Sequence, residues 1–232
     1  MRYALSIAVA LAAFATPAHA QELSGFRIEA RGGWDQLGGK ASIPNPDYDE
    51  DDEDSGPEYL NGSDKDGSIG YGVELGYDVQ MDGGFVIGGY VGAELSDSRM
   101  CVELIEDDLS CTKLKRTFTL GARAGLPIGE TALIYVKGGY SHGKLSTVYD
   151  PDITDNDDEE PGDIFEFSKN RSGFHAGGGV QLGLTENVYA KLEYVYTKYG
   201  SGSYRIGDDD QDPALKVRSD RHQLSAGIGL RF

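Results

Sequence analysis

The feature that most constrains the fold is a strict alternation of apolar and polar residues that recurs along the chain. In the last segment Leu224, Ala226, Ile228, Leu230 and Phe232 share one parity, and small or charged residues occupy the other. Successive side chains of a β-strand point to opposite faces, so a period of two predicts a strand with one apolar and one polar face. The pattern predicts eight such strands, at residues 24–37, 68–80, 84–97, 113–126, 131–149, 170–184, 188–206 and 216–232.

The connections between these segments are alternately long and short. The long ones, near residues 38–66, 99–112, 150–169 and 207–215, are acidic and carry much of the formal net charge of −18. The short ones, QMDGG, PIGE and TEN, have the Gly, Pro, Asp and Asn residues of tight turns. Eight strands joined in this way predict an all-β, antiparallel, up-and-down arrangement with both termini on the side of the short turns.

Strands with two such faces fit two kinds of barrel. In a soluble barrel the apolar faces point inward, whereas in a transmembrane barrel they meet lipid and the polar faces line the lumen. Aromatic residues near the strand ends favour the second, because they form girdles at the two membrane interfaces. The residues concerned are Phe26, Trp34, Tyr77, Phe85, Tyr140, Phe174, Tyr189, Tyr196, Tyr199 and Phe232. We therefore predict a transmembrane β-barrel rather than a soluble periplasmic one.

The first twenty residues differ from the rest. Arg2 precedes an apolar segment at residues 5–14, and Ala18 and Ala20 supply the small residues of a cleavage site. The segment is too short for a transmembrane anchor. We expect a signal peptide over residues 1–20, cleaved after Ala20, and one barrel domain over residues 21–232.

Charges of both signs lie on the polar faces of the strands. The predicted inward set is Arg27, Glu29, Arg31, Glu74, Glu94, Arg123, Lys137, Lys191 and Glu193. An eight-stranded barrel is only just wide enough for side chains to occupy its interior, and opposite charges there should pair. This predicts a structural network of ion pairs. A narrow ion path, helped by the many inward glycines, is the alternative that stays open.

Cys101 and Cys111 are the two cysteines of the chain, and they flank a short acidic stretch. An exported protein meets an oxidising compartment, so we expect a disulfide rather than free thiols. No His lies near them, which argues against a metal site. The acidic stretches DKDG at 64–67 and DDDQD at 208–212 match a calcium loop incompletely. We expect neither a metal nor a cofactor.

Three places contain residue types that lipid-modifying chemistry uses: Ser141 with His142, His175, and His222 near Asp220. Adjacent residues of a strand point to opposite faces, so Ser141 and His142 do not form a direct pair. His175 is expected to be a hydrogen-bonded lumen residue. We therefore expect no enzymatic activity.

The signal peptide, the eight alternating strands, YAKLEYVYTKYG in the seventh segment and HQLSAGIGLRF at the end carry a family likeness. Together they resemble the small outer-membrane β-barrel proteins of Gram-negative bacteria, the OmpA-like and opacity-type group known as the porin family. The resemblance implies extracellular long loops, periplasmic termini and recognition of the closing strand by the barrel-assembly machinery through Ile228, Leu230 and Phe232. No peptidoglycan-binding domain follows Phe232 in this sequence, so we expect no cell-wall tethering.

These observations predict a non-enzymatic, integral outer-membrane surface protein with a structural or envelope role and acidic exposed loops. Its expected surroundings are outer-membrane lipid and lipopolysaccharide, without nucleic acid. A monomer is expected because a closed barrel leaves no sheet edge. The alternative function is a narrow porin-like channel for small solutes or cations, with cation preference imposed by the acidic rim.

Overall fold

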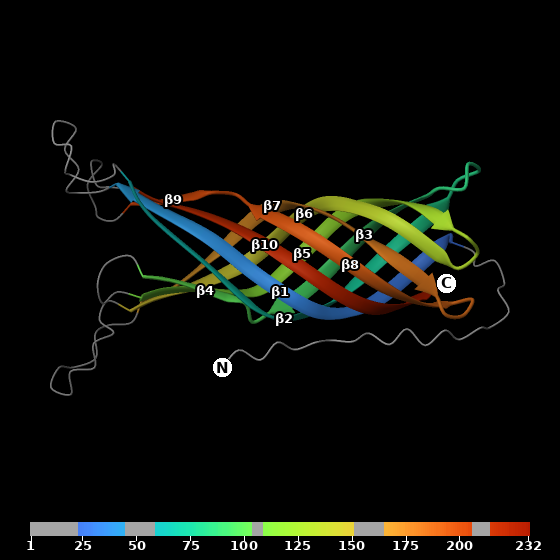
Figure 1. Cartoon of the computed structure of the whole chain (residues 1–232), viewed down its shortest axis with the longest axis horizontal. Coiled ribbons are helices and arrows are strands. Elements are labelled where there is room, and N and C mark those ends of the chain that lie inside the picture. The colour runs from blue at the N-terminus through green and yellow to red at the C-terminus, as the bar shows by residue number, and fades with distance from the viewer. Residues whose placement is uncertain (1–22, 45–58, 104–108, 151–164, 206–213) are drawn as a thin grey trace.

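The protein is an antiparallel β-barrel (Figure 1). The computed structural model describes residues 23–44, 59–103, 109–150, 165–205 and 214–232. Ten strands form one sheet in which β1 pairs with β2 on one side and with β10 on the other. That second pairing closes the barrel. Among the described residues, no helix is long and apolar enough to span a membrane.

Eight strands make the barrel wall, and the predicted eight-stranded fold is confirmed. They are β1 (Gly25–Pro44), β2 (Tyr59–Gln80), β3 (Val86–Ser96), β5 (Leu109–Ile128), β6 (Ala132–Asp150), β7 (Phe165–Gly183), β8 (Val188–Tyr199) and β10 (Ala214–Arg231).

Two short strands extend the wall at one end. The strand β4 (Arg99–Glu103) pairs with β5, and β9 (Gly202–Arg205) pairs with β10. Figure 1 shows both at the end of the barrel opposite the C-terminus. We name this the loop end, and the other, where the short turns lie, the turn end.

The predicted limits of several strands were wrong, because the strands continue into the acidic segments. Instead of ending at residue 37, β1 reaches Pro44, and β2 begins at Tyr59 rather than at residue 68. Their register runs unbroken from Gly25 with Asp78 to Pro44 with Tyr59. Backbone hydrogen bonds between strands do not require an apolar face. The strands therefore continue beyond the residue at which the alternation of apolar and polar residues stops. The DKDG stretch is therefore part of a strand and not a calcium loop.

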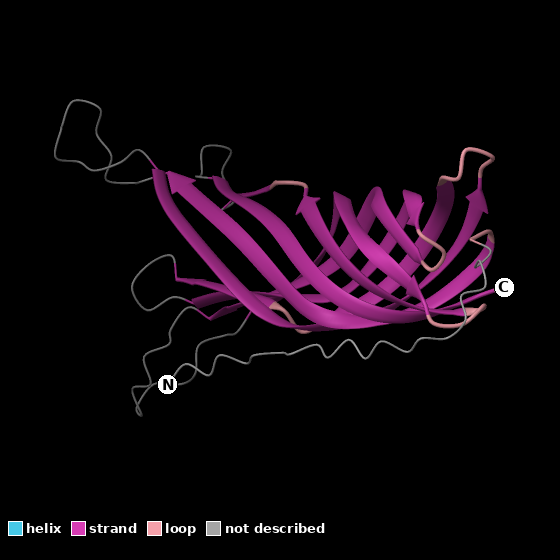
Figure 2. Cartoon of the chain, turned by 45° about the vertical axis from the view of Figure 1, so that its right-hand side comes forward, coloured by secondary structure: helices cyan, strands magenta, loops and turns pink. Residues whose placement is uncertain are grey.

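The remaining acidic stretches lie largely outside the described residues, at 45–58, 151–164 and 206–213. The predicted short connections are confirmed at residues 81–85, 129–131 and 184–187. Gly84 (φ 82°) and Gly129 (φ 64°) supply the left-handed backbone that two of these turns need. Figure 2 shows these turns at the ends of strands that tilt across the barrel wall.

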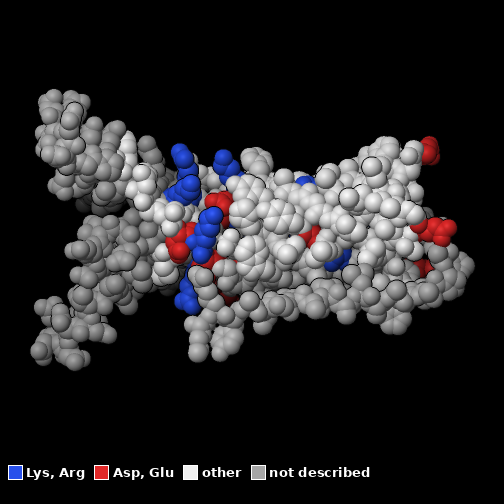
Figure 3. Space-filling model, in the orientation of Figure 1, with Lys and Arg blue, Asp and Glu red and all other residues white. Residues whose placement is uncertain are grey.

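The outside of the barrel is an apolar belt. Alternate residues of every wall strand point outward, and large side chains such as Ile69 and Phe174 are about three-quarters exposed, at 74% and 75%. Figure 3 shows this belt as the broad white surface between the two ends. Two residues assigned to the aromatic girdles were placed wrongly. Tyr189 and Tyr199 lie on the inward parity of β8 and are buried in the interior.

Candidate functional site in the barrel interior

The barrel interior holds charged side chains of both signs, buried or nearly so. In the described residues the cations are seven and the carboxylates six. The cations are Arg27, Arg31, Arg123, Lys137, Lys191, Arg221 and Arg231, and the carboxylates are Glu29, Asp35, Glu74, Asp78, Glu94 and Glu193. They lie in three layers along the barrel axis.

Glu74 is the centre of the middle layer. Its carboxylate accepts hydrogen bonds from Arg27 at 2.8 Å, from Arg31 at 3.0 Å and from Lys137 at 2.7 Å. Glu74 lies on β2, the two arginines on β1 and the lysine on β6. The contact with Lys137 therefore joins strands that are not neighbours in the sheet, across the lumen.

Lys191 links the other two carboxylates of the middle layer. Its ammonium group forms ion pairs with Glu29 and, at 3.4 Å, with Glu193. The hydroxyl of Tyr189 donates to Glu29 at 2.7 Å, and the hydroxyl of Tyr135 donates to Glu193 at 2.7 Å. Buried charges need such additional hydrogen bonds, because their attraction alone does not offset the loss of hydration.

Asp78 organises the layer nearest the turn end. Arg123 donates to both of its oxygens, with Nε 2.9 Å from Oδ1. Arg27 and Arg231 approach Oδ2 at 3.4 Å. A fully buried carboxylate is thus surrounded by three guanidinium groups, each from a different strand.

Arg221 organises the layer nearest the loop end. Its guanidinium group donates to Asp35 through two nitrogens, at 2.8 and 2.5 Å, and to Glu94 at 2.9 Å. Glu94 also pairs with Arg31 and accepts from Gln223 at 2.9 Å. Arg31 therefore connects this layer to the middle one.

Apolar side chains lie beyond the charged layers at both ends. The loop-end cluster contains Leu37, Leu114 and Leu145, and the turn-end cluster contains Leu23, Val86 and Leu133. All six are buried. The charged interior is thereby bounded by apolar groups along the axis.

The inward glycines make room for large side chains rather than for a pore. A methyl group on Gly76 would lie 2.5 Å from the guanidinium group of Arg27, and one on Gly229 would lie 2.3 Å from the ring of Tyr189. The space left by each of these glycines is thus occupied by a side chain from an adjacent strand. This removes the sequence argument that these glycines help to open an ion path.

All nine residues of the predicted inward set lie in the interior and take part in these contacts. Sequence reasoning missed Asp35, Asp78, Arg221 and Arg231. The alternation nevertheless indicates their orientation, because each lies an even number of residues from another inward-facing residue of the same strand. Asp35, Asp78 and Arg231 lie on polar strand faces within the predicted limits, but the predicted network set did not include them.

A Ser–His pair was also missed. Ser141 Oγ lies 2.8 Å from His175 Nδ1, and the hydroxyl of Tyr90 lies 2.5 Å from His175 Nε2. As predicted, His175 is a hydrogen-bonded lumen residue. His142 lies on the outer face and contacts Ser172 at 3.0 Å. The pair joins β6 and β7, where Ser141 is two residues out of register with His175, so sequence neighbours did not reveal it.

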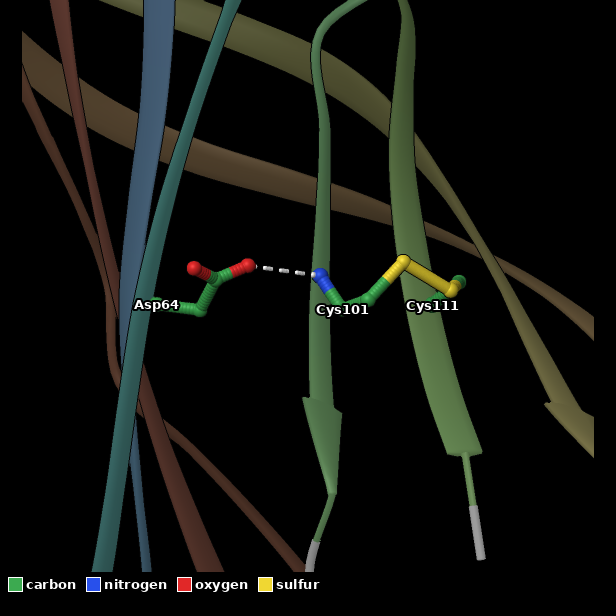
Figure 4. Close-up of a disulfide and its surroundings, with 3 residues drawn as sticks. All are labelled: Asp64, Cys101 and Cys111. Atoms are coloured by element: carbon green, nitrogen blue, oxygen red, sulfur yellow. Dashed lines mark hydrogen bonds between the residues drawn. A yellow bond between two sulfur atoms is a disulfide. The ribbon is translucent and has the colours of Figure 1, made fainter. Parts of the chain in front are cut away.

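The predicted disulfide between Cys101 and Cys111 is present (Figure 4). It joins β4 to β5 at directly opposed positions. The backbone nitrogen of Cys101 also donates to the carboxylate of Asp64 on β2, at 3.1 Å. The short hairpin is therefore tied to two wall strands. In the part of the chain that the structure describes, no group of His, Cys, Asp or Glu is arranged to hold a metal ion.

The residues of the predicted assembly signal lie on the outer face of β10. Ile228, Leu230 and Phe232 are all exposed to the surroundings of the barrel. Phe232 exchanges two backbone hydrogen bonds with Phe26, at 2.8 and 3.1 Å, and so closes the barrel at the turn end. Their recognition by an assembly machinery stays a prediction.

A closed antiparallel barrel with an apolar outer belt and a charged interior defines a class of protein. Closure satisfies the backbone groups of every strand within the sheet, which is what a bilayer requires of a spanning structure. The outward apolar and inward polar alternation is that of transmembrane β-barrels. The fold and the interior together make this chain an integral membrane β-barrel.

The chain belongs to the family described as outer membrane protein beta-barrel domain, whose sequence profile matches residues 6–232. It is a surface protein of the outer membrane. It is similar to the 31 kDa outer-membrane immunogenic protein of Brucella melitensis, with 26% identity over 84% of this chain and 78% of the relative. It is also 28% identical to outer membrane protein A of Shigella flexneri, over 99% of this chain and 55% of that protein.

Solved structures include similar barrels. The outer membrane protein OprG of Pseudomonas aeruginosa covers 90% of this chain and 97% of its own, with a TM-score of 0.47 and 12% identity. Ail of Yersinia pestis covers 90% of this chain and 100% of its own, with a TM-score of 0.40 and 15% identity.

Proposed function

We propose that this protein is a closed, non-conducting barrel with a structural role in the outer envelope, which presents its loop end to the exterior. One observation carries the proposal: the interior is occupied by ion pairs from wall to wall, with apolar clusters beyond them at both ends. A channel needs a continuous hydrated path. Here Lys137 crosses the middle of that path and holds Glu74 at 2.7 Å and Glu193 at 3.2 Å.

The narrow porin-like channel is the second candidate, and its support is weaker. Its sequence argument was the space left by inward glycines, and at Gly76 and Gly229 that space is occupied. Mixed charges that are paired with one another also present no net field of one sign to a passing ion. The acidic rim that would select cations lies largely outside the described residues.

Several features of the protein in its membrane belong to this proposal. We propose that residues 1–20 are a signal peptide cleaved after Ala20, that the termini are periplasmic, and that the mature barrel over residues 21–232 is monomeric. The barrel-assembly machinery would read Ile228, Leu230 and Phe232, and lipopolysaccharide would surround the loop end. The alternation of apolar residues along β10 supports the assembly signal, and the closed sheet supports a monomer. The outer-membrane location of the family supports the signal peptide and the orientation.

The absence of enzymatic activity is part of the proposal as well. His175 is 5% exposed, and both of its ring nitrogens have partners inside the barrel. A general base must reach a proton on its substrate, and no lipid can reach this one past the barrel wall. A change in the mass of lipid A in expressing cells, lost in His175→Ala, would contradict this.

Planar-bilayer recording tests the closed barrel directly. The purified, refolded chain is expected to add no discrete conductance steps to the bilayer at either polarity. A known open porin, inserted under the same conditions, is the positive control. Reproducible cation-selective steps that grow when Glu74 or Lys137 is replaced by alanine would reject the closed barrel and favour the channel.

A further inference from the structure

The outer surface of the barrel carries a groove at the boundary between the apolar belt and the loop end. It consists of two cavities, of about 740 Å³ and 510 Å³, that share the side chains of Lys40 and Arg218. These two residues are direct partners on β1 and β10. We call the two cavities together the boundary groove.

The sheet itself explains why the larger cavity exists. The wall strand β8 ends at Tyr199, where it still pairs with β7, and the chain then passes through Gly200 and Ser201 to β9. Among the described residues, β9 pairs with β10, whereas the loop-end part of β7, residues 165–172, pairs with β6. The two parts of the wall diverge from this point, and the cavity lies between them.

Three cations line the boundary groove: Lys40, Lys198 and Arg218. Each points outward and is exposed. None of them forms an ion pair with a residue that the structure describes, in contrast to the cations of the interior. Figure 3 shows Lys and Arg side chains at this level of the barrel, at the edge of the white belt, with Asp and Glu side chains among them.

The carboxylate in the groove offsets only part of the positive charge of these cations. Among the described lining residues the one acid is Asp220, which lies opposite Lys198 on the neighbouring strand. Its Oδ2 is 3.2 Å from Nε2 of His222, whose Nδ1 lies 2.7 Å from the hydroxyl of Tyr194. The described lining therefore has three positive groups and one carboxylate, and that carboxylate also contacts His222.

The groove continues into the surface that meets lipid. On the side facing the turn end, the groove is lined by Tyr140, Phe174 and Tyr196, which lie at the edge of the apolar belt nearest the loop end. Tyr140 and Phe174 pack edge to face with ring centroids 5.9 Å apart. On the other side, Ser42, Asn61 and Ser63 line the smaller cavity with hydroxyl and amide groups.

We propose that the boundary groove binds the phosphorylated sugar headgroup of lipopolysaccharide. The three cations would bind its phosphates, Ser42 and Ser63 would contact sugar hydroxyls, and acyl chains would lie on Phe174 and Tyr140. Charge-assisted contacts to phosphate are strong where the cation has no competing partner. This rests on the proposed function, since it requires the loop end to lie in the outer leaflet.

Binding of lipopolysaccharide to the detergent-solubilised full chain tests the groove. The variant Lys40→Gln/Lys198→Gln/Arg218→Gln is expected to bind roughly tenfold or more weakly than the unaltered chain, from the loss of three charge-assisted contacts. The matched control is Arg99→Gln/Lys113→Gln/Arg116→Gln, which removes the same charge from β4 and β5, outside the groove. It should keep most of the affinity. A heat-dependent shift on a gel establishes that both variants are folded.

Two further arms identify the chemistry. Dephosphorylated lipopolysaccharide should bind the unaltered chain as weakly as the intact lipid binds the groove variant. Millimolar inorganic phosphate should not displace the lipid. Displacement at that concentration would mean that the site recognises a free anion, and the proposal would be wrong. If the groove and control variants lose the same affinity for the lipid, the binding comes from diffuse charge attraction, and the proposed groove is wrong. An unchanged affinity of the groove variant would also overturn it.

The orientation is measured separately, so that its failure can be distinguished. Lys65→Cys, exposed on the loop-end part of β2 and outside the groove lining, should react with a membrane-impermeant maleimide on intact cells, and Glu130→Cys in a turn should not. The reverse result would reject the proposed orientation and, with it, contact with outer-leaflet lipid in the cell. Binding in detergent would still report on the groove itself.

Discussion

The charged side chains inside this barrel can be buried only because each has partners of opposite charge. Glu74 is almost completely buried, a costly position for a carboxylate, and it is compensated by three cations within 3.0 Å. The arrangement is sensitive to loss of any one member, because the remaining charges keep their desolvation cost without their partner.

Replacing Glu74 by Gln tests that dependence. The change preserves shape but removes the charge that faces Arg27, Arg31 and Lys137, so we expect the free energy of unfolding to fall by about 3–5 kcal/mol. Urea unfolding of the barrel in lipid vesicles measures it. The exposed turn residue Glu130, changed to Gln, serves as the control and should have little effect. A loss below about 1 kcal/mol, the usual value for a solvated pair, would show that water screens the interior.

Gly229 tests how tightly the interior is packed. Alanine at this position would place a methyl group 2.3 Å from the ring of Tyr189, so we expect a loss of about 1–3 kcal/mol from overpacking. A methyl group on Gly89 would lie 3.9 Å from the carbonyl oxygen of Gly121, so alanine there should be tolerated. The same vesicle unfolding experiment compares the two. Equal stability of both variants would mean that Tyr189 moves freely in a wider lumen.

At the level of elements, the ladder of backbone hydrogen bonds extends farther than the apolar pattern. Both β1 and β2 continue past the belt with unbroken register, and β4 and β9 add short pairs at the loop end. The disulfide then joins β4 to β5. The loop end is thus built on a continuation of the wall, and the boundary groove lies where two parts of this continuation diverge.

The closing strand β10 carries the prediction about assembly. If Phe232 is part of the recognised signal, Phe232→Ala should lower the amount of folded protein in the outer membrane while folding into vesicles in vitro stays efficient. Phe174→Ala is the matched control, because the two rings are almost equally exposed, at 74% and 75%. Immunoblots of membrane fractions give the readout. Equal losses for both variants would assign the effect to lipid contact rather than to recognition.

The whole molecule is a closed sheet whose interior and exterior are stabilised by different interactions. The outside depends on apolar contact with the membrane, and the inside on paired charges bounded by apolar clusters. Closure through β1 and β10 leaves no wall strand of the barrel without two neighbours over its central part.

That closure predicts how the protein behaves in detergent. Unheated protein in dodecyl sulfate should keep its barrel and migrate differently from a boiled sample, because the sheet has no free edge at which unfolding can begin. The membrane fraction should also retain the chain after carbonate washing. A single mobility at all temperatures, or release by carbonate, would contradict an integral barrel.

The period-two pattern by itself determined which face of each strand is apolar, the number of wall strands and the sites of the short turns. Parity is a local property of the backbone, so Leu224, Ile228 and Phe232 could be placed outward without any partner. The disulfide followed from two cysteines and the compartment. These features need no knowledge of which residues meet across the barrel.

The tertiary structure alone decided which charges meet and where the strands end. Arg31 contacts Glu94 on β3 and Glu193 on β8, residues far apart in sequence, because the tilt and closure of the sheet bring them into one layer. The parity of β8 places Tyr189 inside, but only the pairing of β8 with β10 shows that Gly229 makes room for its ring. The groove beside Lys40, Lys198 and Arg218 exists because two parts of the wall diverge, and this depends on the pairing of strands rather than on their composition.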